Sequence, residues 1–146
     1  MEYTERLALL HRLRDMLTEQ RSKFQQYLDI LDKQEAAIRA RDVEALYEYA
    51  ELETSVLEEI QAFGKVIRPL QSLYRSAYPQ GEQVIPPLRD SLGRLREQVL
   101  ARNRHNRALL RERIEELKGE MQQARTPAPR RSLYAPAASG LVDITT

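Results

Sequence analysis

The stretch PPLRDSLGRLREQVLARNRHNRALLRERIEELKGEM, residues Pro86–Met121, decides the fold of this chain. Its seam residues recur at intervals of three and four, so a helix places them on one face. Pro86 and Pro87 fit a first helical turn, where a missing N–H group costs little. Thr126-Pro127 ends the pattern. The stretch therefore predicts one long helix, over about residues 86–123, that needs helical partners. The seam consists of Leu88, Leu92, Leu95, Val99, Asn103, Asn106, Leu110, Ile114, Leu117 and Met121.

A second long helix is predicted at the start of the chain, over about residues 3–40, with Thr4 as its N-cap. A strict heptad along it predicts left-handed packing against a neighbour. Further apolar residues widen the stripe and favour a bundle over a two-stranded coiled coil. The heptad is Tyr3, Leu7, Leu10, Arg14, Leu17, Arg21, Phe24, Leu28, Leu31, Glu35 and Ile38, and the residues that widen it are Leu9, Leu13, Met16, Tyr27 and Ile30.

The third predicted helix covers about residues 43–76, with Asp42 as its cap. Residues 40–43 contain neither glycine nor proline, so a continuous helix is the alternative. The turn is preferred because it gives three helices of similar length. Pro69 is expected to kink or end this helix near Ile67, and Tyr78-Pro79-Gln80-Gly81 predicts a type II turn.

Composition supports an all-α protein. The 146 residues carry a net charge of +1 and no cysteine, which excludes disulfides and thiol catalysis. No apolar run approaches the ~20 residues of a membrane helix, so a cytoplasmic location without membrane insertion is expected. We predict an antiparallel three-helix bundle of long helices over 1–124.

Residues 125–146 differ in character from the rest. They are rich in proline, alanine and serine, so they predict a disordered tail. Two short apolar islands interrupt this composition and are candidate docking points for another protein. They consist of Leu133 and Tyr134, and of Leu141, Val142 and Ile144.

Catalytic and metal sites find no support in the sequence. His11 and His105 are the only histidines, each beside arginines and without an HExxH spacing, so a solvated surface position explains them better. The acids follow helical faces without a glycine-rich loop. We expect neither an enzyme nor a cofactor.

Arginines cluster in the organising stretch. Residues 88–113 hold eight arginines against three acids, for a local charge of +5, while residues 29–59 hold ten acids against three bases, for −7. The basic cluster fits either nucleic-acid binding or pairing with the acidic helix. Internal pairing is preferred, because no aromatic residue interleaves with the arginines to stack on bases.

Two features of the organising stretch bear on binding. Asn103 and Asn106 cost stability in an apolar seam but fix register and partner choice, and they mark a place where the bundle can open. Beyond them the helix has more apolar surface than one seam requires. We predict that this half binds a client helix through Leu109, Leu110, Ile114, Leu117 and Met121.

The order of these motifs resembles the FlgN family of flagellar type III export chaperones. The resemblance rests on a long heptad helix, Arg41-Asp42-Val43-Glu44-Ala45-Leu46, a glutamate-rich helix, Asn103–Leu110 and a polar tail. It implies a protein that binds the C-terminal helical segments of hook–filament junction (hook-associated) proteins. Such a chaperone prevents their premature assembly and delivers them to the export gate. The alternatives are a structural coiled-coil adaptor and an arginine-dependent nucleic-acid binder.

Overall fold

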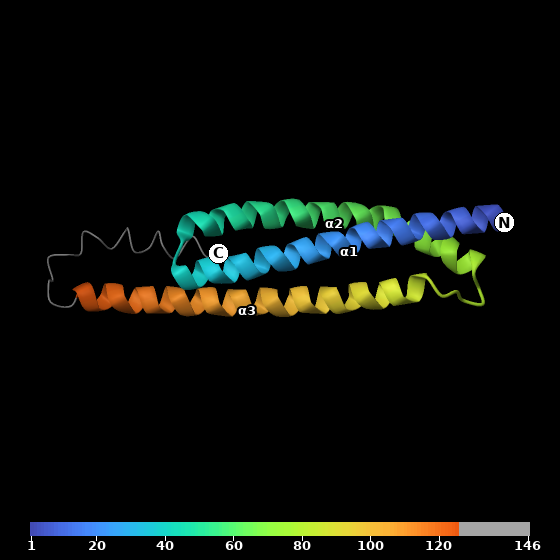
Figure 1. The fold of residues 1–146 in the computed structure, drawn as a ribbon. Helices are drawn as coiled ribbons and strands as arrows, with labels where there is room; N and C mark the ends of the chain where they lie inside the picture. Colours follow the sequence, from blue (N-terminus) through green and yellow to red (C-terminus); the bar gives the residue numbers. More distant parts are fainter. Residues whose placement is uncertain (126–146) are drawn as a thin grey trace. The chain divides into compact units, whose positions relative to one another are not determined.

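A computed structural model describes residues 1–125, which form three α-helices and no strand: α1 (Tyr3–Ala40), α2 (Val43–Ala77) and α3 (Ile85–Arg125) (Figure 1). The all-α prediction is confirmed, with every helix boundary within two residues of its expected position. The chain divides into two compact units, Met1–Arg104 and His105–Thr146. The first unit holds α1, α2 and the first half of α3. The predicted tail lies outside the described residues, apart from Arg125, and so do its five candidate docking residues.

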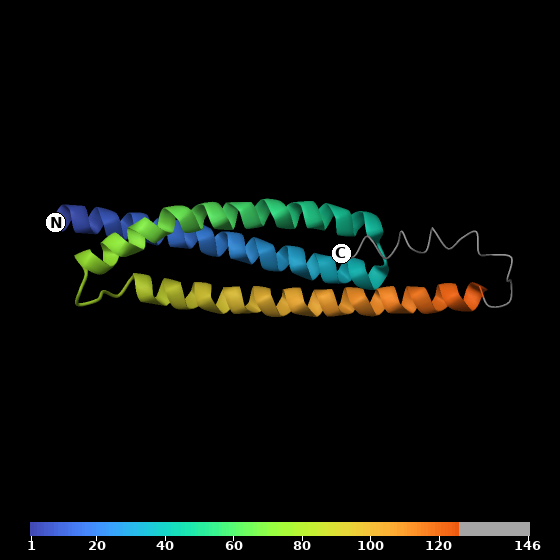
Figure 2. The ribbon, with the colours of Figure 1, turned by 180° about the vertical axis from the view of Figure 1, so that it is seen from behind.

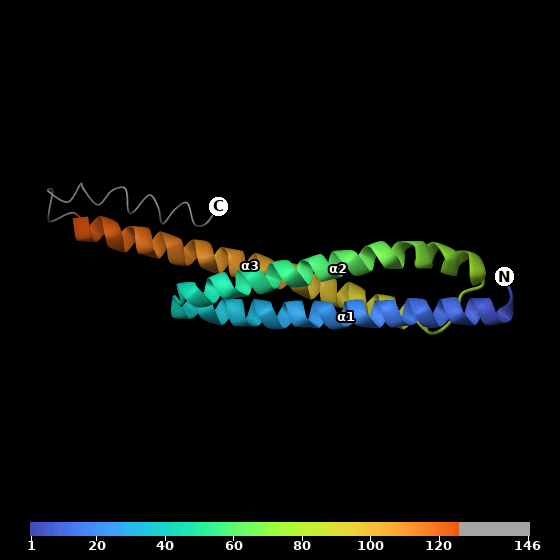
Figure 3. The same cartoon turned by 90° about the horizontal axis from the view of Figure 1, so that it is seen from above.

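A tight turn separates α1 from α2, as predicted. Arg41 adopts the left-handed conformation, with φ of 58°, and its N–H donates to the Ile38 carbonyl at 3.2 Å. The next N–H, of Asp42, donates to the Ala37 carbonyl at 3.0 Å, which completes a Schellman motif. The Asp42 carboxylate accepts the Ala45 N–H at 3.1 Å and so caps α2. The chain therefore reverses here, and α2 runs back beside α1 (Figure 3).

The predicted N-cap of α1 is wrong. Glu2 is the cap, and its backbone N–H donates to the Glu5 carboxylate at 3.3 Å. Thr4 already lies inside the helix. The helix therefore begins two residues earlier than a threonine cap at position 4 would place it. Glu2 and Glu5 form a capping box, which satisfies free N–H groups at the start of the helix.

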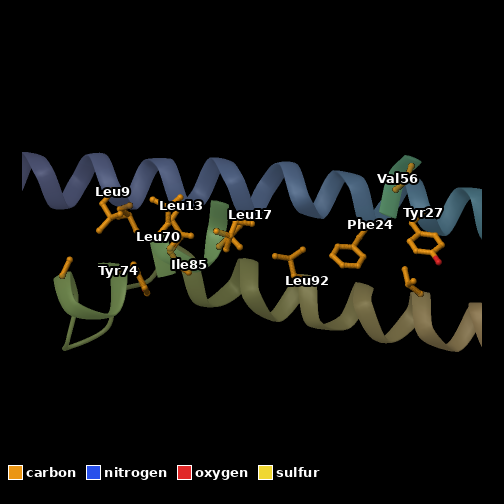
Figure 4. Packing of buried hydrophobic residues seen from close by; sticks show 14 of the residues in the cluster. Leu9, Leu13, Leu17, Phe24, Tyr27, Val56, Leu70, Tyr74, Ile85 and Leu92 are labelled. Carbon is orange, nitrogen blue, oxygen red and sulfur yellow. The ribbon is translucent and has the colours of Figure 1, made fainter. Parts of the chain in front are cut away.

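The core of the first unit joins all three helices (Figure 4). Leu13, Leu17, Leu31 and Ile85 are its most completely buried side chains. On α3 the core cluster includes Ile85, Leu92 and Val99, with Leu88 and Leu95 packed against it. Burying each large apolar side chain contributes roughly 1.5–3 kcal/mol. The core thus confirms a bundle that uses the predicted seam of α3 in this unit.

The predicted heptad of α1 is correct at five buried positions and, in part, at Leu7 and Leu28, which are half-buried and pack against the core; the five are Leu10, Leu17, Phe24, Leu31 and Ile38. Tyr3 and Arg14 are exposed, and Arg21 and Glu35 are only half-buried. The helix instead turns a neighbouring set of residues inward, one position earlier at the alternate sites. The inward series is Leu10, Leu13, Leu17, Gln20, Phe24, Tyr27, Leu31, Gln34 and Ile38, of which all but the half-buried Gln34 are buried. Because two residues of this series, Gln20 and Gln34, are polar, apolar spacing alone does not reveal the series.

Proline does not end α2. The helix continues through the exposed Pro69 to Ala77, and Leu70, Tyr74 and Ala77 beyond the proline are buried. Figure 2 shows the light-green C-terminal part of α2 bending away from the direction of its first part. The prediction of a kink is therefore correct, and that of a helix end near Ile67 is wrong. The proline ring points outward and removes only one backbone hydrogen bond.

The connection to α3 begins with a hydrogen-bonded turn, in which the Gly81 N–H donates to the Tyr78 carbonyl at 3.0 Å. The prediction of a type II turn is wrong. That type needs a positive φ at Gln80, whereas among residues 1–125 only Arg41 and Gly81 have one. Gly81, with φ of 86°, leads the chain out of the turn.

Candidate functional site

A polar layer crosses the core of the first unit at Tyr27. Its hydroxyl donates to Glu53 Oε1 of α2 at 2.8 Å and accepts from Asn103 Nδ2 of α3 at 3.1 Å. Tyr27 as a whole is only 3% exposed, and Figure 4 shows its side chain in line with those of Leu17 and Phe24 along α1. One phenol therefore links all three helices, and its bond to a carboxylate is charge-assisted.

Two glutamines of α1 extend this polar layer along α2. Gln34 Nε2 donates to the second carboxylate oxygen of Glu53 at 3.3 Å. Gln20 is buried, and its Nε2 donates to the Ile60 carbonyl at 3.4 Å. Glu53 thus accepts two bonds from α1. The half-buried position of Glu53 between these donors was not predicted from the sequence.

Charge pairing between helices is present at Arg102 of α3. Its guanidinium lies 3.2 Å from the Asp32 carboxylate and 3.3 Å from that of Glu35, both on α1. On the other side of α1, Lys23 pairs with Glu59 of α2 at 2.6 Å. These contacts support the internal-pairing interpretation for Arg102. They are partly exposed pairs, which contribute little stability and mainly fix register.

The predicted client-binding residues lie on the second half of α3, in the unit that begins at His105. Leu109 is buried, whereas Leu110, Ile114 and Met121 are half-buried. Leu117 is 36% exposed. The spacing of Leu110, Ile114, Leu117 and Met121 places them on one face of this helix. Arg113 and Glu116, at 2.9 Å, and Lys118 and Glu115, at 3.5 Å, form ion pairs along the same stretch.

The two seam asparagines have different surroundings. Asn103 is half-buried and reaches Tyr27, so in the first unit it acts as a fixed member of the polar layer. Asn106 is buried and belongs to the second unit. Register fixing, the structural interpretation of these residues, is therefore supported for Asn103 by a direct bond between helices.

Glu82 organises the start of α3. Its carboxylate accepts the Val84 N–H at 2.7 Å, and the Ile85 N–H at 2.6 Å, while the Tyr74 hydroxyl donates to it at 2.7 Å. Backbone N–H groups at the start of a helix have no carbonyl acceptor within that helix. The Glu82 carboxylate accepts two such groups, those of Val84 and Ile85, and Pro86 has no N–H group that needs an acceptor. Burial of this carboxylate raises its pKa, but the hydrogen bonds from Tyr74 and from the backbone N–H groups of Val84, Ile85 and Gln83 lower the pKa more, and the net pKa is lowered.

The partner of Glu82 shows the opposite effect. Burial raises the pKa of Tyr74 to about 12, and the Glu82 carboxylate adds to that rise. The Arg89 guanidinium lies 5.6 Å from the centre of the Tyr74 ring, and Tyr78 stacks at 5.5 Å between ring centres. This cluster locks the junction of α2 and α3.

Sequence reasoning missed Gln20, Gln34, Tyr74 and Glu82. A signal existed for the two glutamines, since they lie seven residues either side of Tyr27. A signal also existed for Glu82, an acid shortly before a Pro-Pro helix start. Tyr74 had none, because its role depends on a contact across the turn.

Residues 1–125 contain no group of three or more potential metal ligands, and His11 and His105 are exposed. None of the helices is long and apolar enough to span a membrane within that range.

Comparison with known proteins gives one informative relative. A protein of Treponema pallidum (strain Nichols), described only as uncharacterized, is 40% identical over 124 residues, which cover 85% of this chain and 80% of that protein. No protein-family model and no solved structure matches the sequence.

Proposed function

We propose that this chain, which belongs to the same family as the Treponema pallidum protein, is an export chaperone of the FlgN type. It binds the C-terminal helical segments of hook–filament junction proteins in the cytoplasm. It holds these segments apart until the subunits reach the type III export gate. The resemblance in the order of motifs along the whole chain supports the choice of this chaperone class.

The observation that carries the proposal is the apolar face of α3 beyond residue 105. Leu110, Ile114, Leu117 and Met121 recur at helical spacing, yet each is only half-buried or exposed. A folded chain without a partner gains nothing from keeping such a row in contact with water. A client helix with its own apolar stripe would cover it.

Binding by this face follows the helix-in-groove mode, in which anchors at i, i+3, i+4 and i+7 set the register. Each apolar side chain that is fully covered contributes roughly 1.5–3 kcal/mol. A client segment that folds on binding loses part of this gain to its ordering, which costs about 2–5 kcal/mol or more. The result is an affinity that allows both escort and release.

The test uses the C-terminal segment of a hook–filament junction protein from the same genome, labelled and titrated with the purified full chain. Leu110→Glu combined with Leu117→Glu is expected to weaken binding about 100-fold or more, since each change places a charge in an apolar contact. The matched control is Leu52→Glu combined with Leu73→Glu, which alters two exposed leucines of α2 and should leave the affinity unchanged.

Equal affinity of the wild type and the α3 double variant, both folded by circular dichroism, would refute this surface. Absence of any binding to junction-protein segments would refute the chaperone class and favour a coiled-coil adaptor. Affinity that falls steeply between ~0.1 and ~0.3 M salt would point to phosphate-like contacts through the arginines instead of apolar docking.

A further inference from the structure

The surface charge of α2 changes sign along the helix. Residues 43–64 hold six glutamates and no basic residue, whereas residues 65–77 hold three basic residues and no acid. Two of the glutamates, Glu53 and Glu59, contact α1. The other charged residues of α2 are exposed and form no ion pair within residues 1–125; they are Glu44, Glu48, Glu51, Glu58, Lys65, Arg68 and Arg75. One half of α2 therefore presents negative charge to solvent, and the other half presents positive charge.

An exposed apolar row lies beside these charges. Leu52, Val66 and Leu73 are each between 41% and 51% exposed. They are separated by whole heptads, of fourteen and seven residues, so they lie along one side of α2. Ala62, between them, is also exposed, and its small side chain lets another helix approach closely. A partner that covers this row would remove large apolar side chains from water.

The residues of this face are placed symmetrically about Phe63, in the middle of α2. One acid–base pair lies five residues to either side of Phe63, a second lies twelve residues to either side, and a pair of leucines lies eleven and ten residues away. These pairs are Glu58 and Arg68, Glu51 and Arg75, and Leu52 and Leu73. A helix with this symmetry is complementary to a copy of itself that runs in the opposite direction. In a parallel pair, by contrast, each acid would face an acid.

We propose that a second copy of this chain covers this face, through an antiparallel contact between the α2 helices about a two-fold axis near Phe63. In this contact Glu58 lies opposite Arg68 of the partner subunit, and Glu51 lies opposite Arg75 of the partner subunit. The two-fold axis repeats both pairs, so four pairs form between the protomers. The second copy is favoured over a foreign partner because α2 alone carries both members of every pair. All of these residues belong to the first compact unit.

The size of the contact sets its strength. From residue 51 to residue 75 the helix is about 36 Å long, and a helix is about 10 Å wide. A strip of these dimensions is smaller than the ~800 Å² that each partner buries in a standard interface. Exposed ion pairs add little to affinity and are screened by salt. We therefore expect a weak dimer whose formation depends on both protein and salt concentration.

Analytical ultracentrifugation of the full chain tests the proposal, at protein concentrations up to ~500 µM and at ~50 mM and ~500 mM salt. The wild type is expected to form a dimer at low salt and to dissociate at high salt, because the charged pairs are exposed. Leu52→Glu with Leu73→Glu should also sediment as a monomer, since it places charges in the apolar row.

Two charge-reversal variants separate this contact from other modes of association. The first is Glu51→Lys with Glu58→Lys, and the second is Arg68→Glu with Arg75→Glu. Each should raise the dimer Kd about 100-fold, because four attractive pairs become repulsive. An equimolar mixture of the two should form a heterodimer with about the wild-type Kd, since all four pairs are then attractive again.

The control is Arg94→Glu with Arg96→Glu, which changes the net charge as much as the second variant does, at exposed positions of α3, and should leave the wild-type Kd unchanged. A variant that loses helical signal in circular dichroism is replaced by its glutamine version. Three results would overturn the proposal: a wild type that stays monomeric at ~500 µM, a dimer that tolerates both reversals, or a mixture that stays monomeric. No client enters this assay, so its outcome is independent of the chaperone proposal.

Discussion

Replacing Tyr27 by phenylalanine tests whether the polar layer holds the bundle together. The substitution keeps the buried ring and removes only the hydroxyl. That hydroxyl makes a 2.8 Å bond to the Glu53 carboxylate and a 3.1 Å bond from Asn103. The variant therefore isolates two bonds that join α1 to both of its neighbours, without creating a cavity of any size.

The magnitude follows from the two bonds. A hydrogen bond to a charged group contributes about 1.5–3 kcal/mol and a neutral one about 1 kcal/mol. Glu53 is half-buried, so water can replace part of the lost contact, while Asn103 is left with an amide donor at a partly buried site. We expect the free energy of unfolding to fall by about 2–3 kcal/mol.

Urea unfolding followed by circular dichroism measures this difference. The midpoint should fall with no change in slope, since the same surface is exposed on unfolding. Tyr47→Phe is the matched control, because Tyr47 is exposed and makes no hydrogen bond within the described residues. A Tyr27→Phe change below about 0.5 kcal/mol would show that the layer is a consequence of packing and contributes no stability of its own.

Four further predictions follow from other parts of the fold. Leu13→Ala, at a fully buried position, should lower stability by about 3–5 kcal/mol, whereas Leu28→Ala, at a half-buried one, should cost about half as much; thermal melts compare them. Arg41→Gly should raise stability by about 1 kcal/mol in the same assay, since glycine adopts the left-handed conformation without strain. The pKa of Glu82 is lowered on folding, so its contribution is present above the unfolded pKa and lost as pH falls through the folded one. Glu82→Gln should therefore flatten the acid side of the stability curve, and an unchanged curve would contradict this. Truncation after Arg125 should leave the melting temperature and client affinity intact and reduce client export from cells, and undiminished export would remove the tail from the delivery mechanism.

Helix spans were predictable because they depend on local chemistry. The Asp42 cap, the prolines at the start of α3 and the apolar stripes each act within a few residues of the boundary they set. No glycine in the sequence indicates the chain reversal at Arg41. The reversal was still predicted, because a turn at this point gives three helices of similar length.

The candidate client surface and the polar layer were predictable to different degrees. The stripe at Leu110–Met121 is a periodic pattern on one helix, so the sequence contains all of it. The bond from Tyr27 to Glu53 joins residues 26 positions apart, on helices whose relative rotation the sequence does not give. The sequence therefore does not distinguish Glu53 from the other five glutamates of residues 43–64.

The error in the α1 heptad has a physical explanation that also says what the polar residues do. Leu13, Gln20, Tyr27 and Gln34 lie seven residues apart and occupy one heptad position, and the last three each donate a hydrogen bond to α2. The buried leucines, phenylalanine and isoleucine occupy the other position. Apolar spacing alone does not identify this row, because two of its residues, Gln20 and Gln34, are amides. The predicted heptad therefore used the row of Arg14, which lies one position later along the helix. The same amides specify the pairing: sliding α1 by one turn against α2 would break all three bonds, at about 1 kcal/mol or more each, while the apolar row would find new contacts. Apolar layers thus supply most of the stability of the α1–α2 pair, and the polar row selects its register.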